Sequence, residues 1–175
     1  MLKKVTKEWL IILLRLKKSS KKKSKRIRVS KYFEKKISIS EVSNLIRQQI
    51  ANKRGDDFER KVVHFNKPKF FDEFFSHPNL KKFTNEGPVT PDHVIRVKPF
   101  PMIITPKKNS SIDDFKKTAE KAFENYRKKY VNYFKVNSKK VKDKKVMLDT
   151  SPRVVLVQNV GMFSVGKDLG SAKIA

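Results

Sequence analysis

The segment 90–98 concentrates the reactive side chains of this sequence, because a carboxylate, an imidazole, a guanidinium and an ammonium fall within seven residues. The four residues are Asp92, His93, Arg96 and Lys98. An arginine fork assisted by a lysine charge holds a phosphate or a carboxylate, and an imidazole near neutral pH adds a donor or exchanges a proton. These residues are therefore candidate ligand or phosphate contacts. The alternative is structural, with Asp92 capping a turn and Arg96 pairing with it.

The elements around this segment should decide which of its side chains meet. Pro91 fixes its own φ and disfavours a helical residue before it, so a turn is predicted there. The β-branched run 94–97 predicts a short strand that Pro99 ends. Alternation along that strand would place Arg96 and Lys98 on one face.

A second candidate is the glycine segment 161–168, which nearly satisfies the phosphate-loop pattern G-x-x-x-x-G-K-[ST]. Its members are Gly161, Gly166 and Lys167. Asp168 stands where a hydroxyl should bind magnesium, and its charge would oppose nucleotide phosphates. A nucleotide-binding loop therefore remains an alternative.

The three histidines do not form a recognisable metal motif. His64, His77 and His93 are irregularly spaced, and the sequence holds no H-x-H or H-E-x-x-H pair. It also holds no cysteine and no G-x-G-x-x-G dinucleotide loop. We therefore assign no catalytic residue, no metal site and no cofactor to this chain.

Three segments resemble one family. T-P-D-H-V-I-R-V-K at 90–98 resembles the T-P-D-H-x-I-R-T-K segment of the bifunctional rhamnulose-1-phosphate aldolase/alcohol dehydrogenase family. Residues 151–157 and 160–167 resemble that family's P-R-V-V-L-V-P-G-V-G-M-F-x-x-G-K segment, and 126–134 resembles its Y-x-x-Y-x-x-Y-F helix. The resemblance covers roughly residues 35–175, with Val97 in place of Thr and Gln158-Asn159 in place of Pro-Gly.

The resemblance implies an α/β fold: a partial layered helix–sheet unit, with a class II aldolase-like remnant and the start of a second strand–loop–helix unit. We expect a basic N-terminal segment over 1–31, an aldolase-like C-terminal region over 32–105, and a connecting helix with the incomplete unit over 106–175. The family cleaves rhamnulose-1-phosphate and oxidises the lactaldehyde, with zinc and NAD implied for its full-length members. Because its zinc and dinucleotide motifs are missing from this sequence, we expect a fragment or split member, inactive alone, that assembles with the missing aldolase or dehydrogenase parts. A sugar phosphate is the expected ligand.

The charge of the chain suggests an alternative function. The net charge of +26 suggests a polyanion such as nucleic acid. However, 34 of the 43 basic residues are lysine, whereas base and phosphate readers favour arginine, so a bias spread over solvated faces explains the charge as well. The apolar run 9–14 is followed by basic residues, which is unlike a secretory signal, and no run is long enough to cross a bilayer. We expect a cytoplasmic protein.

Periodicity predicts the remaining elements. Ser38 with Glu41, and Ser111 with Asp114, predict capping boxes at the starts of two helices, the second of about 24 residues with one apolar stripe. Strands are predicted at 61–65, 146–148 and 154–157, and helices at 70–75 and from 168. Loops are predicted at 79–87 and 161–166, with a turn at 55–57.

Overall fold

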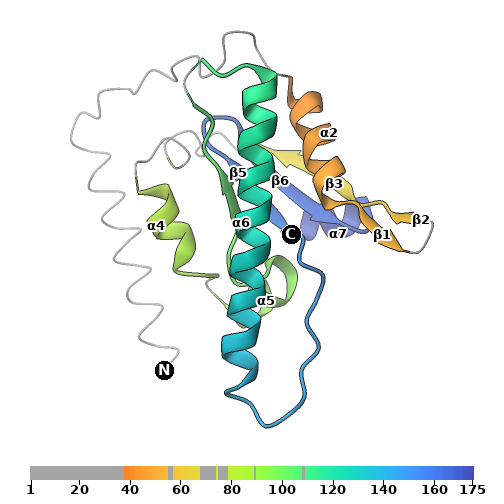
Figure 1. Ribbon diagram of the computed structural model, residues 1–175, viewed down its shortest axis with the longest axis vertical. Helices are drawn as coiled ribbons and strands as arrows, with labels where there is room; N and C mark the ends of the chain where they lie inside the picture. Colours follow the sequence, from red (N-terminus) through yellow and green to blue (C-terminus); the bar gives the residue numbers. More distant parts are fainter. Residues whose placement is uncertain (1–37, 55–56, 68–73, 75–78, 89, 108) are drawn as a thin grey trace.

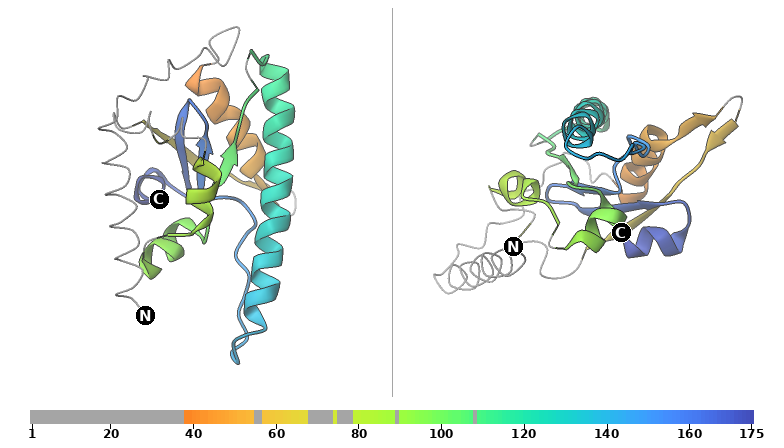
Figure 2. Two further views of the ribbon diagram at one scale, coloured as in Figure 1. Left: turned by 90° about the vertical axis from the view of Figure 1, so that its left-hand side faces the viewer. Right: turned by 90° about the horizontal axis from the view of Figure 1, so that it is seen from below.

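The fold is organised around a mixed four-stranded sheet that lies between two groups of helices (Figures 1 and 2). The computed structural model describes residues 38–175, apart from 55–56, 68–73, 75–78, 89 and 108. The strands lie in the order β3 (Val62–Asn66), β6 (Gly161–Gly166), β5 (Val154–Val157) and β4 (Met102–Ile104). Strand β6 pairs antiparallel with β3 and β5, and β5 pairs parallel with β4. The fold is therefore α/β, which confirms the predicted class.

Helices cover both faces of the sheet. One face carries α2 (Ile39–Ile50) and α6 (Ile112–Ser138), while α4 (Leu80–Asn85), α5 (Pro91–Val97) and α7 (Leu169–Ile174) lie on the other (Figure 2). Strand β5 is consequently buried at every residue. Its Val155 and Val157 join the core under α2 and α6, whereas Val154 and Leu156 pack with Leu80 of α4. A continuous apolar run is what a strand covered on both faces requires.

Both helices on the first face begin at the predicted capping boxes. The hydroxyl of Ser38 accepts a hydrogen bond from the Glu41 backbone N–H at 3.2 Å, and the Glu41 carboxylate accepts from the Ser38 N–H at 2.7 Å. Ser111 and Asp114 form the same reciprocal pair at the start of α6. These bonds satisfy N–H groups that have no partner inside the helix, so each helix start is fixed locally.

Helix α6 buries one apolar stripe against the sheet. Its buried members are Phe115, Ala119, Phe123, Tyr126 and Tyr130. Their spacing of three and four residues confirms the predicted stripe as core. Ile112 and Tyr133 continue the same spacing at the two ends but are 38% and 39% exposed, so the buried stripe is shorter than the apolar pattern.

Two segments expected as strand or loop are helices. The predicted strand at 94–97 is wrong: α5 spans Pro91–Val97, with Pro91 in the first turn, where its missing N–H costs no hydrogen bond. A β-branched run favours a strand only where another strand can pair with it, and 94–97 lies in neither described sheet. The predicted loop at 79–87 is also wrong, because Leu80 anchors α4 from a buried position.

Predictions about strands fail at two further places. The loop expected at 161–166 is β6, a central strand paired on both sides. The strand expected at 146–148 does not form, and Val146 is 85% exposed, since no described strand lies beside it. Strand β4 and the hairpin of β1 (Asn52–Arg54) and β2 (Asp57–Glu59) were not predicted as strands. The strand at 61–65, the strand at 154–157 and the helix after Asp168 are confirmed as β3, β5 and α7.

Some expectations fall outside the described residues. They concern the basic segment 1–31, most of the helix predicted at 70–75, and the first two residues of the turn at 55–57. Among the helices that the structure does describe, none combines the length and the apolar character needed to span a membrane.

Candidate functional site

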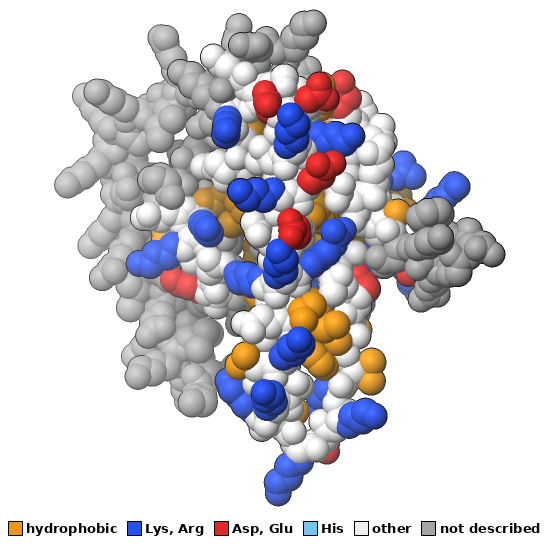
Figure 3. Space-filling model, viewed as in Figure 1, with side chains coloured by type: hydrophobic (Ala, Val, Ile, Leu, Met, Phe, Trp, Pro, Cys, Tyr) orange, Lys and Arg blue, Asp and Glu red, His pale blue; other side chains and the backbone are white. Residues whose placement is uncertain are grey.

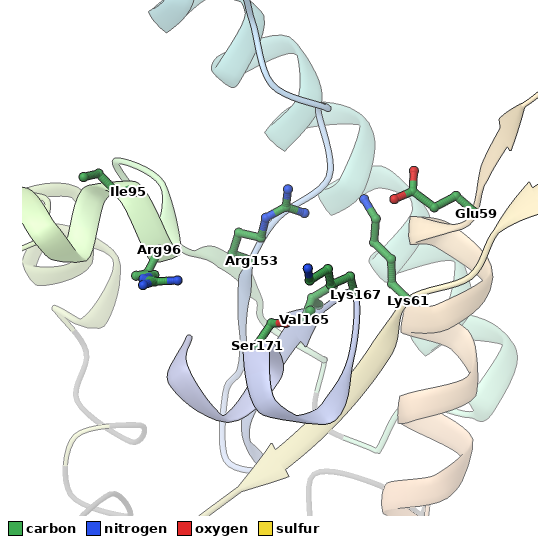
Figure 4. Close-up of a pocket in the computed structure, with 9 residues that line it drawn as sticks. Glu59, Lys61, Ile95, Arg96, Arg153, Val165, Lys167 and Ser171 are labelled. Atoms are coloured by element: carbon green, nitrogen blue, oxygen red, sulfur yellow. The ribbon is translucent and has the colours of Figure 1, made fainter.

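A cleft of about 340 Å³ lies between α5, the start of β3 and the junction of β6 with α7. Its charged walls come from separate parts of the chain: Glu59, Lys61, Arg96, Arg153 and Lys167. Figure 4 shows these side chains arranged around one hollow, with Arg96 reaching in from α5 and Lys167 from the β6–α7 junction. The walls therefore carry four cations and one carboxylate.

Asp149 positions two of these cations. Its Oδ1 accepts a hydrogen bond from Lys61 Nζ at 3.0 Å, and its Oδ2 accepts one from Arg153 Nη2 at 2.5 Å. The backbone N–H of Ser151 also donates to Oδ1, at 3.0 Å. Because the side chain of Lys61 is only 4% exposed, this lysine is held in one orientation with its charge paired. Asp149 thus fixes the base of the cationic wall.

Lys98 joins α5 to the same cluster from beneath. This residue ends α5 with a φ of 66° and is buried. Its Nζ donates to the backbone carbonyl oxygens of Asp149 and Ser151, the latter at 2.8 Å, and lies 4.1 Å from the centre of the Tyr130 ring. Lys98 therefore has a structural task, because it holds the end of α5 against the 149–151 segment.

Burial is the largest influence on the pKa values of Lys98 and Asp149. It lowers the pKa of Lys98 to about 8; the charge of Asp149 opposes this shift, whereas Arg153 and Lys61 add to it. Burial alone would raise the pKa of Asp149, but the Lys61 hydrogen bond, the Lys98 charge and the contacts with Arg153 outweigh it. The pKa of Asp149 consequently lies well below its ordinary value, and this carboxylate is charged at neutral pH.

The cations at the mouth of the cleft are available to a ligand. Arg96 and Lys167 are exposed, and neither forms an ion pair within the part of the chain that the structure describes. Lys61 and Arg153 share the single charge of Asp149. The cleft is therefore positive overall, and its chemistry is that of an anion site: an arginine fork with ammonium groups beside it.

The structure separates the four residues singled out at 92–98. Only Arg96 lines the cleft. His93 Nδ1 lies 2.7 Å from Thr90 Oγ1 in the first turn of α5, and Asp92 lies exposed beside it. Lys98 is buried, so the expected placement of Arg96 and Lys98 on one strand face is wrong. The strand pattern failed because successive residues of a helix turn by about 100°, not by the 180° of a strand.

The glycine segment does not have the geometry of a phosphate loop, because residues 161–166 form β6. Packing explains both of its glycines. A Cβ on Gly161, which has a φ of 154°, would lie 2.5 Å from the Phe65 ring, and a Cβ on Gly166 would collide with the backbone nitrogen of Ala172. Lys167, in contrast, does line the cationic cleft.

The described residues do not fit a zinc site. They contain no group of three or more histidine, cysteine, aspartate or glutamate residues close enough to hold a metal ion. His64 lies in β3 and His93 in α5, and His77 falls outside the described residues. We therefore assign no zinc-dependent step to the described residues.

Sequence reasoning missed Lys61, Asp149 and Arg153. Lys61 resembles the many solvated lysines, and Asp149 ends a polar stretch, so residue type alone does not distinguish them. The signal that existed was the i, i+4 separation of Asp149 and Arg153 beside an apolar strand. Only the sheet brings Lys61 to the other two residues, across 88 positions of sequence.

Comparisons with known proteins agree with this architecture. The family model described as aldolase class II, second domain, matches residues 38–175, which is well over half of the chain. No curated protein and no solved structure matches the chain.

Proposed function

The chain belongs to the family of class II aldolase second domains, and on that premise we propose that its cationic cleft holds the phosphate of a sugar phosphate. The observation that supports this function is the convergence of Lys61, Arg96, Arg153 and Lys167 from four places in the chain on one hollow. Bringing cations from distant parts of the chain together is unfavourable, because like charges repel one another. An anionic ligand removes that repulsion.

The shape of the cleft suits a small phosphate ester. Its volume of about 340 Å³ lies at the lower end of the range typical of small-molecule sites. Arg153 is held by Asp149 and Arg96 is exposed, so a phosphate would meet one fixed and one mobile guanidinium. A fixed group limits the entropy lost on binding, and a mobile one adapts to the rest of the ligand.

More specifically, we propose that the domain works in a protein of the bifunctional rhamnulose-1-phosphate aldolase/alcohol dehydrogenase type, in cytoplasmic sugar metabolism. The sequence resemblance over 90–98, 126–134 and 151–167 supports this assignment. In such a protein, zinc would polarise the ketose carbonyl and NAD would accept the hydride, at residues other than those described. The part of this chain would be to bind and orient the phosphate end of the substrate.

Calorimetric titration tests the proposal. Rhamnulose-1-phosphate and inorganic phosphate should bind, and unphosphorylated rhamnulose should not. The double variant Arg96→Gln/Lys167→Gln should weaken phosphate binding by roughly 10-fold or more, because two charge-assisted hydrogen bonds are lost. Neither side chain makes an ion pair among the described residues, so the melting temperature should not change.

A variant with the same loss of charge controls for the high net charge. Lys142→Gln/Lys144→Gln removes two exposed lysines from the connection after α6 and should leave phosphate binding unchanged. Equal weakening by both double variants would contradict a built site. Binding of unphosphorylated rhamnulose as tight as that of its phosphate would contradict the proposal as well.

The alternative of nucleic-acid binding predicts a different pattern. A single-stranded oligonucleotide would then bind tightly, with an affinity that falls steeply as salt rises. The two double variants, Arg96→Gln/Lys167→Gln and Lys142→Gln/Lys144→Gln, would weaken its binding to a similar degree. We expect weak oligonucleotide binding without preference for the cleft.

A further inference from the structure

A second and larger cleft, of about 580 Å³, runs between α4, β4 and α6. Its rim is formed by Lys81, Lys107, Lys117, Lys121 and Lys129. Figure 3 shows basic side chains over α4 and α6 on this face, with hydrophobic side chains visible between them. We call this cleft the lysine groove.

The lysine groove has no counter-charge of its own, because no carboxylate is among its lining residues. Lys129 Nζ donates to Asn85 Oδ1 at 2.7 Å and lies 4.0 Å from the centre of the Phe100 ring, so its nearest partners are neutral. Its pKa is lowered, first by burial and then by the charge of Lys81. Two carboxylates outside the lining interact with its lysines: Asp114 with Lys117 and Lys107, after its hydrogen bonds with Ser111, and Glu124 with Lys121, after its contacts with Lys128. The groove therefore favours an anionic occupant.

The floor of the groove is the open edge of the sheet. Strand β4 is the last strand in the order and pairs with β5 alone among the described residues. The carbonyl oxygen of Ile104 accepts a hydrogen bond from the Gln158 N–H at 2.9 Å, on the β5 side. Because backbone groups alternate in direction along a strand, the N–H and C=O of Ile103 point to the open edge. An extended chain lying in the groove would find both groups there.

The apolar part of the floor distinguishes a peptide from a nucleic acid. Pro101 and Ile103 are half-buried and line the groove. They form an apolar surface that a side chain of an added strand could contact. The aromatic rings there are poor stacking platforms for bases, since Phe100 is 7% and Tyr126 4% exposed. A strand that adds to a sheet edge gains affinity from its backbone and specificity from alternate side chains.

We propose that the lysine groove binds an extended acidic segment of a partner protein, which adds to the sheet as a strand beside β4. One set of alternate side chains of that segment is apolar and meets Pro101 and Ile103. The carboxylates point to the opposite face of the added strand and pair there with the lysines of α6. This interaction is independent of phosphate binding in the cationic cleft.

The test uses a fluorescent synthetic peptide of alternating glutamate and valine with the full chain. Fluorescence anisotropy should show binding that Ile103→Pro weakens by about 10-fold, because proline removes the edge N–H while leaving the bonds of β4 to β5 intact. Ile103→Val keeps that N–H and should bind as the unaltered chain does. Hydrogen exchange at the Ile103 amide should slow when the peptide is present.

Two further experiments distinguish the contribution of the lysine charges to peptide binding from that of the backbone hydrogen bonds. Lys117→Gln/Lys121→Gln should weaken peptide binding about 10-fold, whereas Lys142→Gln/Lys144→Gln, with the same change in net charge, should not. A peptide N-methylated at every residue should lose binding, because neither of its edges can then donate a hydrogen bond to β4. Equal effects of the two lysine pairs, or undiminished binding of the N-methylated peptide, would overturn the proposal. So would an oligonucleotide of equal charge that competes at the same concentration and is insensitive to Ile103→Pro.

Discussion

The two basic regions of this protein differ in how their charge is balanced. In the cationic cleft, Asp149 pairs with Lys61 and Arg153, and the buried Lys98 lies beside it. In the lysine groove, no carboxylate is among the lining residues, and Lys129 contacts the Asn85 amide oxygen and the Phe100 ring. An internal counter-charge makes a cluster part of the fold, whereas cations without one can be balanced only from outside. The following predictions test that difference.

The largest effect should come from Asp149→Asn. This substitution leaves the buried Lys61 and Lys98 without their shared counter-charge, so the free energy of unfolding should fall by roughly 3 kcal/mol. Urea denaturation followed by circular dichroism measures the change. Glu124→Gln, which breaks the exposed pair with Lys128, is the matched control and should leave the midpoint unchanged. Equal effects of the two substitutions would remove the distinction between built and solvated charges.

The next largest effect on stability should come from Gly166→Ala. The added methyl group collides with the backbone of Ala172, so α7 must shift away from β6, at a cost of about 2 kcal/mol. The same shift moves Lys167, and phosphate binding should weaken with the fold. Thermal unfolding with and without phosphate measures both effects. An unchanged melting temperature would show that packing does not explain this glycine.

The pH dependence of stability should carry the signature of Lys98. Its pKa is lowered in the folded chain to about 8, from an ordinary 10.5, so between these pH values the unfolded chain binds more protons and stability rises with pH. Above pH 10 the trend should reverse, because burial raises the pKa of Tyr126 well above its ordinary value, so the unfolded chain loses this proton first. Urea midpoints from pH 7.5 to 10.5 measure this profile. Lys98→Met should remove most of the rise between pH 8 and 9.5 and leave the smaller contribution of Lys129, whose pKa burial also lowers. An undiminished rise in Lys98→Met would assign it to other groups.

The smallest effect should come from the lysine groove and should have the opposite sign. Lys81→Gln removes a charge that acts unfavourably on Lys129, so the free energy of unfolding should increase by less than about 0.5 kcal/mol at low salt. The gain should disappear at high salt, where the repulsion is screened. Differential scanning calorimetry at two salt concentrations detects it. A loss of stability would mean that Lys81 has a stabilising partner.

Local signals predicted local structure well. The capping boxes at Ser38 and Ser111 and the apolar stripe of α6 depend only on residues within a turn or two of one another, and all three are confirmed. The α/β class and the class II aldolase relationship were also accessible from sequence. The errors at 94–97 and 161–166 have one cause. A β-branched or glycine-bounded run becomes a strand only if another strand pairs with it, and pairing partners are distant in sequence.

The amino-acid sequence by itself determined where α2 and α6 start, which face of α6 is buried and to which family the chain belongs, since each of these rests on residue type and short spacing. Tertiary structure alone decided the two charged regions. It brought Lys61 to Asp149 and Arg153, set Arg96 at the mouth of that cluster, and left the edge of β4 open under a rim of lysines. The physical reason is that each side chain's charge is known from sequence, but its balance depends on which groups the sheet places within a few ångströms.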